Sequence, residues 1–323
     1  MRKISIFVAG LALLASCSNS PKQTEEGSAE STKSGELSGT IQLSGAFALY
    51  PMAVKWSEEF RKLHPNVTID ISGGGAGKGM TDALSGVVDI GMVSREIYPE
   101  ELEKGAFPIA VVKDAVIPTI NAANPELATI KKVGLTKEKA AKLWNQEFKT
   151  WGELLGTSSK LPVRVFTRSD ACGAAETFAA WFGKKQEDLK ATAIMGDPGV
   201  AAAVQSEKAG IGYNNIAYAY DQKTRKLFDG LAIIPIDGNE NGKIDAEEDF
   251  YENTSSLIQA INDGRYPSPP ARDLYLVTKG KPTKPEVVAF LDYVLTEGQQ
   301  YADETGFIGL SDEKLTQALQ KIK

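Results

Sequence analysis

Histidine, cysteine and long apolar runs are scarce in this chain, which has one His and two Cys among its 323 residues. A single His excludes any catalytic or metal centre that needs paired histidines, and two Cys in unlike contexts exclude a disulfide framework. Beyond the N-terminus no segment reaches about 18 consecutive apolar residues, so no later transmembrane helix is predicted. The net charge of −6, without a block of Lys and Arg, gives no electrostatic footprint for nucleic acid.

The residues that are present fit an ordinary globular protein, with 42% hydrophobic and 24% charged side chains. This composition excludes wholesale disorder and fibrous repeats, and the length predicts about two domains of roughly 150 residues. A nucleophilic Cys172 would need a general base, but the sole histidine, His64, lies in a different predicted element. The sequence therefore does not predict an enzyme.

The N-terminus has the features of a targeting segment. Two basic residues precede an apolar run at residues 6–14, which is too short to cross a bilayer of about 30 Å as a helix. The sequence LASC at residues 14–17 resembles a bacterial lipobox, so residues 1–16 are predicted to be a lipoprotein signal peptide and Cys17 the lipidated residue; ordinary cleavage nearby is the alternative. Residues 17–36, which are rich in Ser, Thr, Lys, Glu and Gly, predict a flexible tether. We expect a periplasmic or cell-surface protein, held to the membrane only by its lipid.

Strand-like and helix-like segments alternate through the rest of the chain. Val67, Ile69 and Ile71 alternate with polar residues as in a strand, whereas Trp56 and Phe60 lie one helical turn apart. The same alternation continues through strand-like segments at 88–93, 109–120, 163–166, 210–213 and 274–277 and helix-like segments at 137–144, 174–182 and 287–295. This pattern predicts a parallel α/β architecture.

Two breaks in the pattern suggest boundaries between two lobes. One lies at residues 115–121, and the other is the Pro-rich stretch 266–270, where extended geometry is enforced. A chain that leaves one lobe, builds a second and then returns would explain both breaks. The prediction assigns residues 37–115 and 268–323 to lobe 1 and residues 116–267 to lobe 2.

Three turns that lead from a predicted strand to a predicted helix are candidate anion sites. They comprise residues 44–51, the glycine cluster 73–79, and residues 168–174, where Arg168 and Asp170 lie beside the helix start. A helix N-terminus exposes backbone N–H groups, and Arg suits bidentate oxyanion binding. The glycine cluster matches neither the P-loop nor G-x-G-x-x-G, and a tight turn with positive φ is its alternative explanation. For Arg168 the alternative is a surface ion pair.

Several motifs, in order, resemble those of periplasmic phosphate-binding proteins. They are WSEEF at 56–60, GGGAG at 73–77, VDIGMVSR at 88–95, Arg168-x-Asp170 with its following glycine, LY at 274–275 and GF at 306–307. The resemblance covers most of residues 40–310. It implies the two-lobed fold of type II periplasmic binding proteins, an α/β fold with a hinged ligand cleft. It also implies a receptor that delivers phosphate or a related oxyanion to the membrane subunits of an ABC transporter.

The resemblance also implies which residues line the ligand cleft. They are Phe47, Ala48, Gly75, Ala76, Gly77, Lys78, Ser94, Arg95, Arg168, Asp170, Cys172, Gly173 and Ala174. Family members usually carry Ser or Thr hydroxyls at the turns, where this chain has Ala48, Ala76, Lys78, Cys172 and Ala174. Ser94 and Arg168 are retained, although some relatives carry Asp in place of Ser94. Backbone donors survive such changes, but the loss of several hydroxyls would weaken phosphate binding unless Lys78 compensates.

Residues 237–248 match a twelve-residue calcium loop at every key position. Side-chain oxygens are expected from Asp237, Asn239 and Asn241, a turn at Gly242, a carbonyl ligand from Lys243, and further ligands from Asp245 and Glu248. The residues before the loop, 231–236, are strand-like, so the usual leading helix is missing. We expect bound calcium to stabilise the edge of a lobe, whereas the alternative is an acidic surface loop.

Two classes of function stay open at this point. The first is a lipid-anchored receptor for phosphate or a different oxyanion, closing two lobes over its ligand. The second is a calcium-stabilised surface lipoprotein of the same fold that has lost ligand capture and acts as an interaction protein. The missing hydroxyls favour the second, whereas an unpaired Lys78 and Arg168 in one cleft would favour the first, because a buried unpaired charge is costly.

Overall fold

The computed structural model describes residues 36–323. The predicted signal peptide, the lipidation site Cys17 and nearly all of the predicted tether lie outside the described residues. Across residues 36–323, no helix combines the length and the apolar character needed to cross a bilayer.

The described chain folds into strands and helices that alternate for most of its length. The strands are β1 (Gly39–Gly45), β2 (Val67–Gly73), β3 (Ile90–Val93), β4 (Ala106–Asn121), β5 (Arg164–Arg168), β6 (Thr192–Ile194), β7 (Gly210–Asn215), β8 (Leu231–Ile233) and β9 (Ala271–Lys279). The helices are α1 (Tyr50–Leu63), α2 (Ala76–Ser85), α3 (Pro99–Glu103), α4 (Leu127–Val133), α5 (Lys137–Trp144), α6 (Trp151–Leu155), α7 (Gly173–Trp181), α8 (Gly196–Ser206), α9 (Ile216–Ala219), α10 (Thr254–Asn262), α11 (Pro285–Leu295) and α12 (Asp312–Ile322).

The strands pair in the order β2-β1-β3-β9-β4-β7-β5-β6, and β8 pairs with β4. The predicted α/β class is confirmed, but the prediction of a parallel sheet is wrong for its centre. The outer pairs β1–β2, β1–β3, β5–β6 and β5–β7 are parallel, whereas β9 and β4 pair antiparallel with each other and with their neighbours β3 and β7. The reason lies in the chain path, because β4 leads from one half of the sheet to the other and β9 leads back.

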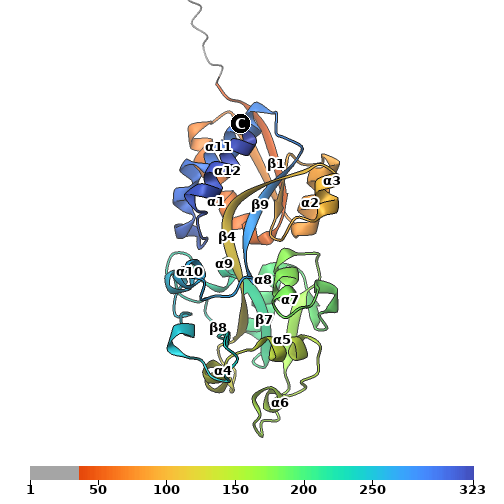
Figure 1. Ribbon diagram of the computed structural model, residues 1–323, viewed down its shortest axis with the longest axis vertical. Coiled ribbons are helices and arrows are strands. Elements are labelled where there is room, and N and C mark those ends of the chain that lie inside the picture. Colours follow the sequence, from red (N-terminus) through yellow and green to blue (C-terminus); the bar gives the residue numbers. More distant parts are fainter. Residues whose placement is uncertain (1–35) are drawn as a thin grey trace, which may run out of the picture. The chain divides into compact units, whose positions relative to one another are not determined.

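Buried apolar side chains form two large clusters, and each cluster defines one lobe. Lobe 1 is built around a cluster drawn from residues 41–112 and 274–322. Lobe 2 is built around a cluster drawn from residues 115–271, with Ile308 added. Figure 1 shows β4 and β9 passing between the lobe that carries α1, α11 and α12 and the lobe that carries α4, α5 and α6. The segment 115–121, which the sequence suggested as a break, lies within the second half of the continuous strand β4.

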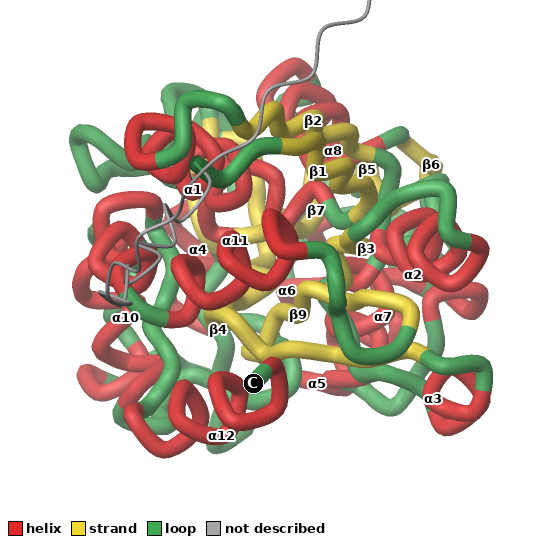
Figure 2. Tube along the Cα trace, turned by 90° about the horizontal axis from the view of Figure 1, so that it is seen from above, coloured by secondary structure: helices red, strands yellow, loops and turns green. Residues whose placement is uncertain are grey.

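Helices cover both faces of the sheet in lobe 1. Figure 2 places α1 and α11 on one side of its strands and α2 on the other. Helix α1 buries Met52, Trp56 and Phe60, which recur at helical spacing, and Pro51 in its first turn fits the fixed φ of a helix start. Because β1 and β2 are parallel neighbours, their carboxyl ends and the turns after them lie at one edge of the sheet.

Candidate functional site

The three turns that the sequence marks as anion sites lie together in the structure. In lobe 1, the N–H groups of Gly74 and Gly75 both donate to the Gly45 carbonyl, at 2.9 and 3.1 Å, and so hold the second turn against the first. Across the lobes, the Gly77 N–H donates to the Ala171 carbonyl at 3.1 Å. The start of α2 in lobe 1 therefore meets the turn before α7 in lobe 2.

Two glycines allow this close approach of the lobes. A Cβ on Gly75 would lie 2.7 Å from both the Ala171 carbonyl oxygen and Asp170 Oδ2. A Cβ on Gly173 would lie 2.0 Å from the Ser94 carbonyl oxygen. Gly75 also has a φ of 88°, so the tight-turn explanation and the close-approach explanation both apply to it.

Each of the three turns carries backbone N–H groups that donate to no acceptor in residues 36–323. They are the N–H groups of Phe47 and Ala48, of Ala76 and Lys78, and of Gly173 and Ala174. The last two pairs stand at the N-termini of α2 and α7, where the helix dipole adds partial positive charge. This arrangement suits an oxyanion and depends on no hydroxyl side chain.

Arg168 lies at the end of β5 beside these donors and is almost completely buried, with 1% of its side chain exposed. Its Nε donates to Asp170 Oδ1 at 2.8 Å, its Nη2 pairs with Asp170 Oδ2, and its Nη1 pairs with Asp197. Burial alone would lower the pKa of Arg168, but the two carboxylates overcome that effect and raise it. Arg168 and Asp170 are therefore part of a buried network that includes Asp197, and they do not form a surface ion pair.

The Phe47 ring completes this wall of the site. The ring centroid lies 5.5 Å from the Arg168 guanidinium carbon. The backbone carbonyl of Phe47 accepts a hydrogen bond of 2.9 Å from the Tyr218 hydroxyl of α9. Phe47 belongs to lobe 1 and Arg168 to lobe 2, so this contact also joins the lobes.

Lys78 does not take the place expected of it. Its Nζ pairs with Asp82, one turn further along α2, and 47% of the side chain is exposed. A Lys four residues before an Asp on one helix face meets it in this way, so the ammonium is already paired. In this structure the Lys78 N–H group belongs to the array of free donors, whereas its ammonium is paired with Asp82.

Arg95 and Ser94 come directly after β3 and face lobe 2. Arg95 pairs with Glu101 of α3 and, through Nε at 3.3 Å, with Glu176 of α7. Tyr98 stacks under the Arg95 guanidinium at 4.3 Å and donates its hydroxyl to the same Glu176. We call Arg95, Tyr98 and Glu176 the interlobe latch. Ser94 is buried, and its carbonyl faces Gly173.

Cys172 acts as the N-cap of α7. Its Sγ accepts the Ala175 N–H at 3.4 Å, and its own N–H donates to Gln186 Oε1 at 3.0 Å. Burial raises the pKa of the Cys172 thiol to about 12, so the thiol stays protonated at neutral pH and is a poor nucleophile.

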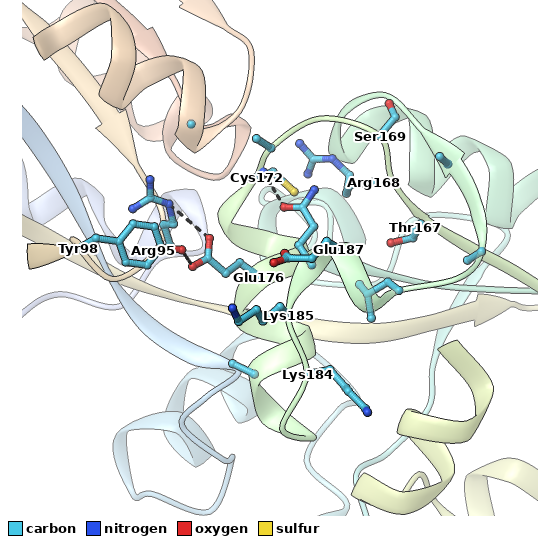
Figure 3. A pocket seen from close by; sticks show the side chains of 17 residues that line it. Arg95, Tyr98, Thr167, Arg168, Ser169, Cys172, Glu176, Lys184, Lys185 and Glu187 are labelled. Carbon is cyan, nitrogen blue, oxygen red and sulfur yellow. Dashed lines mark hydrogen bonds and ion pairs between the residues drawn. The ribbon is translucent and has the colours of Figure 1, made fainter. Parts of the chain in front are cut away.

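A cavity of about 860 Å³ adjoins the latch (Figure 3). Figure 3 shows Glu176 between the lobe 1 side chains Arg95 and Tyr98 and the lobe 2 turn that carries Arg168 and Cys172. Two lysines of the loop after α7, Lys184 and Lys185, also line it. Residues of both lobes therefore line this cavity, and they include the interlobe latch and parts of the second and third turns.

Sequence reasoning missed the partners that surround Arg168 and the latch. They are Asp114, Tyr98, Glu176, Asp197, Asn215 and Arg272. Asp114 is the one acidic residue within the apolar stretch 109–120, which is a signal of a buried polar role. The others carry no local pattern, because their partners lie far away in sequence.

Backbone N–H groups of the predicted calcium loop donate to two of its own carboxylates. Asp237 accepts the N–H groups of Asn241 and Gly242 at 3.2 and 2.8 Å, and Glu248 Oε1 accepts those of Gly238 and Asn239 at 2.9 and 3.2 Å. Gly242 has the positive φ, 86°, that the turn needs. Within residues 36–323, no three His, Cys, Asp or Glu side chains are grouped as a metal site would require.

The side chains of Asn239 and Asn241 also face the loop's acidic residues. Both amide nitrogens donate to Asp245 Oδ2, at 3.1 and 2.7 Å, and Lys243 Nζ pairs with the same carboxylate. The Lys243 ammonium lowers the pKa of Asp245 to about 2, and the two amides contribute to the shift. Asp245 is therefore ionised at neutral pH, as a calcium ligand must be.

The chain is similar in sequence to known binding proteins. Residues 29–297 match the family model for the PBP superfamily domain. The phosphate-binding protein PstS of Staphylococcus haemolyticus is 26% identical over 298 residues, which cover 89% of this chain and 86% of that one. The PstS of Pseudomonas aeruginosa is 29% identical over 330 residues, which cover 91% and 90% of the two chains.

Solved structures of similar proteins agree with this fold. A candidate phosphate ABC transporter substrate-binding protein from Clostridium perfringens, solved with bound phosphate, aligns with a TM-score of 0.69 at 23% identity, covering 84% of this chain and 100% of that one. An ABC-type phosphate transport receptor from Vibrio cholerae gives 0.61 at 16% identity, with the same coverage. The resemblance to phosphate-binding proteins and the predicted type II fold are confirmed.

Proposed function

Because this chain belongs to the PBP superfamily, we propose that it is the substrate-binding receptor of an ABC transporter, with phosphate or a closely related oxyanion as its ligand. The observation that carries this proposal is the convergence of free backbone N–H groups from three turns beside the buried Arg168. Relatives named as phosphate-binding proteins align over most of their length and support it.

Backbone donors can hold the anion without hydroxyl side chains. Positions 48, 76, 172 and 174 lack a hydroxyl, yet the N–H groups at Ala48, Ala76 and Ala174 remain available. A hydrogen bond to a charged partner contributes about 1.5–3 kcal/mol, so losing hydroxyls lowers affinity while several such bonds preserve binding. The ligand set therefore favours an oxyanion with several acceptor oxygens.

Capture is proposed to occur by closure of the lobes about β4 and β9. The Gly77–Ala171 hydrogen bond and the interlobe latch join residues of different lobes, so both form only when the lobes meet. An anion held by turns of both lobes would add to these contacts and shift the population towards the closed form.

Thermal unfolding of the purified protein tests the proposal. The protein is dialysed against chelator and then melted with phosphate, arsenate, sulfate, molybdate or tungstate. A ligand at 100 times its Kd stabilises the folded state by about 2.7 kcal/mol, so a binding anion raises the midpoint. A shift with phosphate and arsenate supports a phosphate receptor, and a shift with another oxyanion alone changes the substrate. No shift with any anion contradicts the receptor.

One observation favours the second candidate, a surface lipoprotein that acts as an interaction protein. Arg168 is already matched by Asp170 and Asp197, and Lys78 is paired with Asp82. The site therefore does not contain an unpaired Arg168 or Lys78 that would demand an anion. The melting experiment separates the two candidates, because the interaction protein would show no anion-dependent shift.

Attachment through a lipid on Cys17 and a place in the periplasm or at the cell surface are part of the proposal. The sequence LASC at residues 14–17 supports both. Cys17→Ala should release the protein from membranes, and mass spectrometry of the wild-type N-terminal peptide should show a diacylglyceryl cysteine. An unmodified Cys17 in a membrane fraction would contradict the anchor.

Calcium is proposed as a structural ion of the loop at residues 237–248. The sequence match at residues 237–248 supports this proposal, together with the turn at Gly242 and the backbone N–H groups that donate to Asp237 and Glu248. Calcium should raise the melting temperature of chelator-treated protein, and magnesium, which needs tighter octahedral geometry, should raise it less. Equal melting with and without calcium contradicts the site.

A further inference from the structure

A buried charge pair lies where the two strands that join the lobes run side by side. Asp114 of β4 and Arg272 of β9 are register partners, and their side chains are 1% and 7% exposed. Arg272 Nη2 lies 3.6 Å from Asp114 Oδ2, which is beyond a hydrogen bond. In residues 36–323, neither oxygen of Asp114 and neither Nε nor Nη1 of Arg272 has a hydrogen-bond partner.

A chain of hydrogen bonds connects this pair to Arg168. Arg272 Nη2 donates to the Asn215 side-chain oxygen at the end of β7. The Asn215 amide nitrogen donates to Asp197 Oδ1 at 2.8 Å, and Asp197 Oδ2 pairs with Arg168. Arg272 and Arg168 are therefore two ends of one buried network that reaches the three turns.

The charge of Arg272 also acts on Glu176 of α7. Burial raises the pKa of Glu176, in the first turn of that helix, and the positive charges of Arg95 and Arg272 oppose the rise. Burial likewise lowers the pKa of Arg272, and the carboxylates of Asp114 and Asp197 oppose that change. The geometric link from Arg272 to the three turns is the hydrogen-bond chain through Asn215 and Asp197 to Arg168.

The two arginines of the network differ in how their guanidinium groups are paired. Arg168 lies between Asp170 and Asp197, so this trio carries one net negative charge. Arg272 brings the sum to zero, and an ionised Asp114 returns it to −1. An unpartnered, buried N–H of a guanidinium is costly, and an anion would satisfy it.

We propose that Arg272 is an anion-binding residue of the interlobe site, whose Nε and Nη1 donate to the oxyanion, and that Asp114 is its counterion until the anion binds. This inference rests on the proposed oxyanion function. When the anion arrives, Asp114 takes up one proton from solvent, because two negative groups then compete for one guanidinium.

The surroundings of Asp114 fit that exchange. Arg272 of β9 favours its ionised form, whereas Asp197 of α8 and burial favour the neutral one; the backbone N–H groups of Ala115 and Ile216 face it without forming hydrogen bonds. The charge of Asp114 also acts on Tyr218 of α9 and Tyr266 before β9, whose hydroxyls donate to the Phe47 and Val116 carbonyls and stay protonated because burial raises their pKa. Burial raises the pKa of Asp114 to about 7, so proton uptake is possible near neutral pH.

Calorimetric titration with inorganic phosphate at pH 8 tests the assignment, in two buffers of different ionisation enthalpy. Wild type should bind with proton uptake. Arg272→Gln should weaken binding by about 10- to 100-fold, whereas Asp114→Asn should bind at least as tightly as wild type and without proton uptake. Asp273→Asn is the matched control, because this neighbour of Arg272 pairs with Lys314 outside the network. Each variant's melting is recorded, and Arg272→Lys replaces Arg272→Gln if the latter does not fold.

The outcomes are separable. If Arg272→Gln binds phosphate like wild type, or if it and Asp114→Asn weaken binding equally, the pair only holds the strands and the inference is wrong. If wild type itself does not bind phosphate while its calcium-dependent melting is normal, the proposed function fails, and this inference fails with it.

Discussion

Gly173→Ala should prevent closure of the lobes while leaving each lobe folded. A Cβ at this position would lie 2.0 Å from the Ser94 carbonyl oxygen, 2.4 Å from its carbonyl carbon and 2.5 Å from Oγ. Contacts below 3.0 Å are not tolerated, so the two backbones must separate by at least 1.0 Å, the difference between 3.0 and 2.0 Å. Gly173 has no positive φ, so alanine adds no backbone strain.

The magnitude depends on the contacts that separation would break. The Gly77–Ala171 hydrogen bond contributes about 1 kcal/mol, and the charged hydrogen bonds to Glu176 contribute about 1.5–3 kcal/mol. The loss of about 2–4 kcal/mol of closed-state stabilisation predicts phosphate binding weaker by roughly 30- to 1,000-fold. The melting temperature without ligand should change little, because both apolar clusters remain intact.

Calorimetric titration with phosphate measures the affinity, and small-angle X-ray scattering with and without phosphate measures closure. Wild type should become more compact with phosphate, and Gly173→Ala should not. Gly309→Ala is the matched control, because its Cβ would meet only Gln299 Oε1, at 3.9 Å. If Gly173→Ala binds phosphate and compacts like wild type, the contact between Ser94 and Gly173 does not limit closure and the reasoning is refuted.

Three further predictions concern the charged groups. Arg168→Ala should abolish phosphate binding and lower the free energy of unfolding in urea by about 3–5 kcal/mol, because it leaves Asp170 and Asp197 buried without their partner; a fully stable variant would contradict the network. Asp114→Asn should melt several degrees above wild type at pH 8 but not at pH 4. The reason is that the folded-state pKa of Asp114 is raised from 3.8 to about 7, so the wild-type protein loses stability as the pH rises through that window. If the variant and the wild type melt at the same temperature at both pH values, the pKa of Asp114 is not raised. Glu248→Gln should remove the calcium-dependent rise in melting temperature, since Glu248 is the proposed bidentate ligand; a retained rise would place calcium elsewhere.

Local patterns in the sequence were sufficient to locate the three turns. Glycines after a strand and before a helix, and Arg168 two residues before Asp170, are features of one short segment each. The alternation of strands and helices likewise predicts the α/β class. The direction of β4 and β9 could not be predicted, because an apolar run such as 109–120 looks the same whichever way its neighbours run.

The partners in the site could not be predicted for a related reason. Asp197 meets Arg168 across 29 residues, and Arg272 meets Asn215 across 57. No periodicity or spacing links positions so far apart, and only the fold brings them together. Lys78 is the opposite case, because its partner is close in sequence. A lysine beside a glycine cluster suggested a ligand contact, whereas its ammonium forms an ion pair with Asp82, four residues later on the same helix face.

Together these contacts change the meaning of the missing hydroxyls. Side-chain donors have been lost at the turns, but the backbone donors, the glycines that let the lobes meet and the latch through Glu176 are all in place. Gly173 leaves room for the Ser94 backbone where the lobes meet, and two N–H groups of Arg272 are buried without partners in residues 36–323. An oxyanion would satisfy the free N–H groups of the closed form, so these features favour the receptor over the interaction protein.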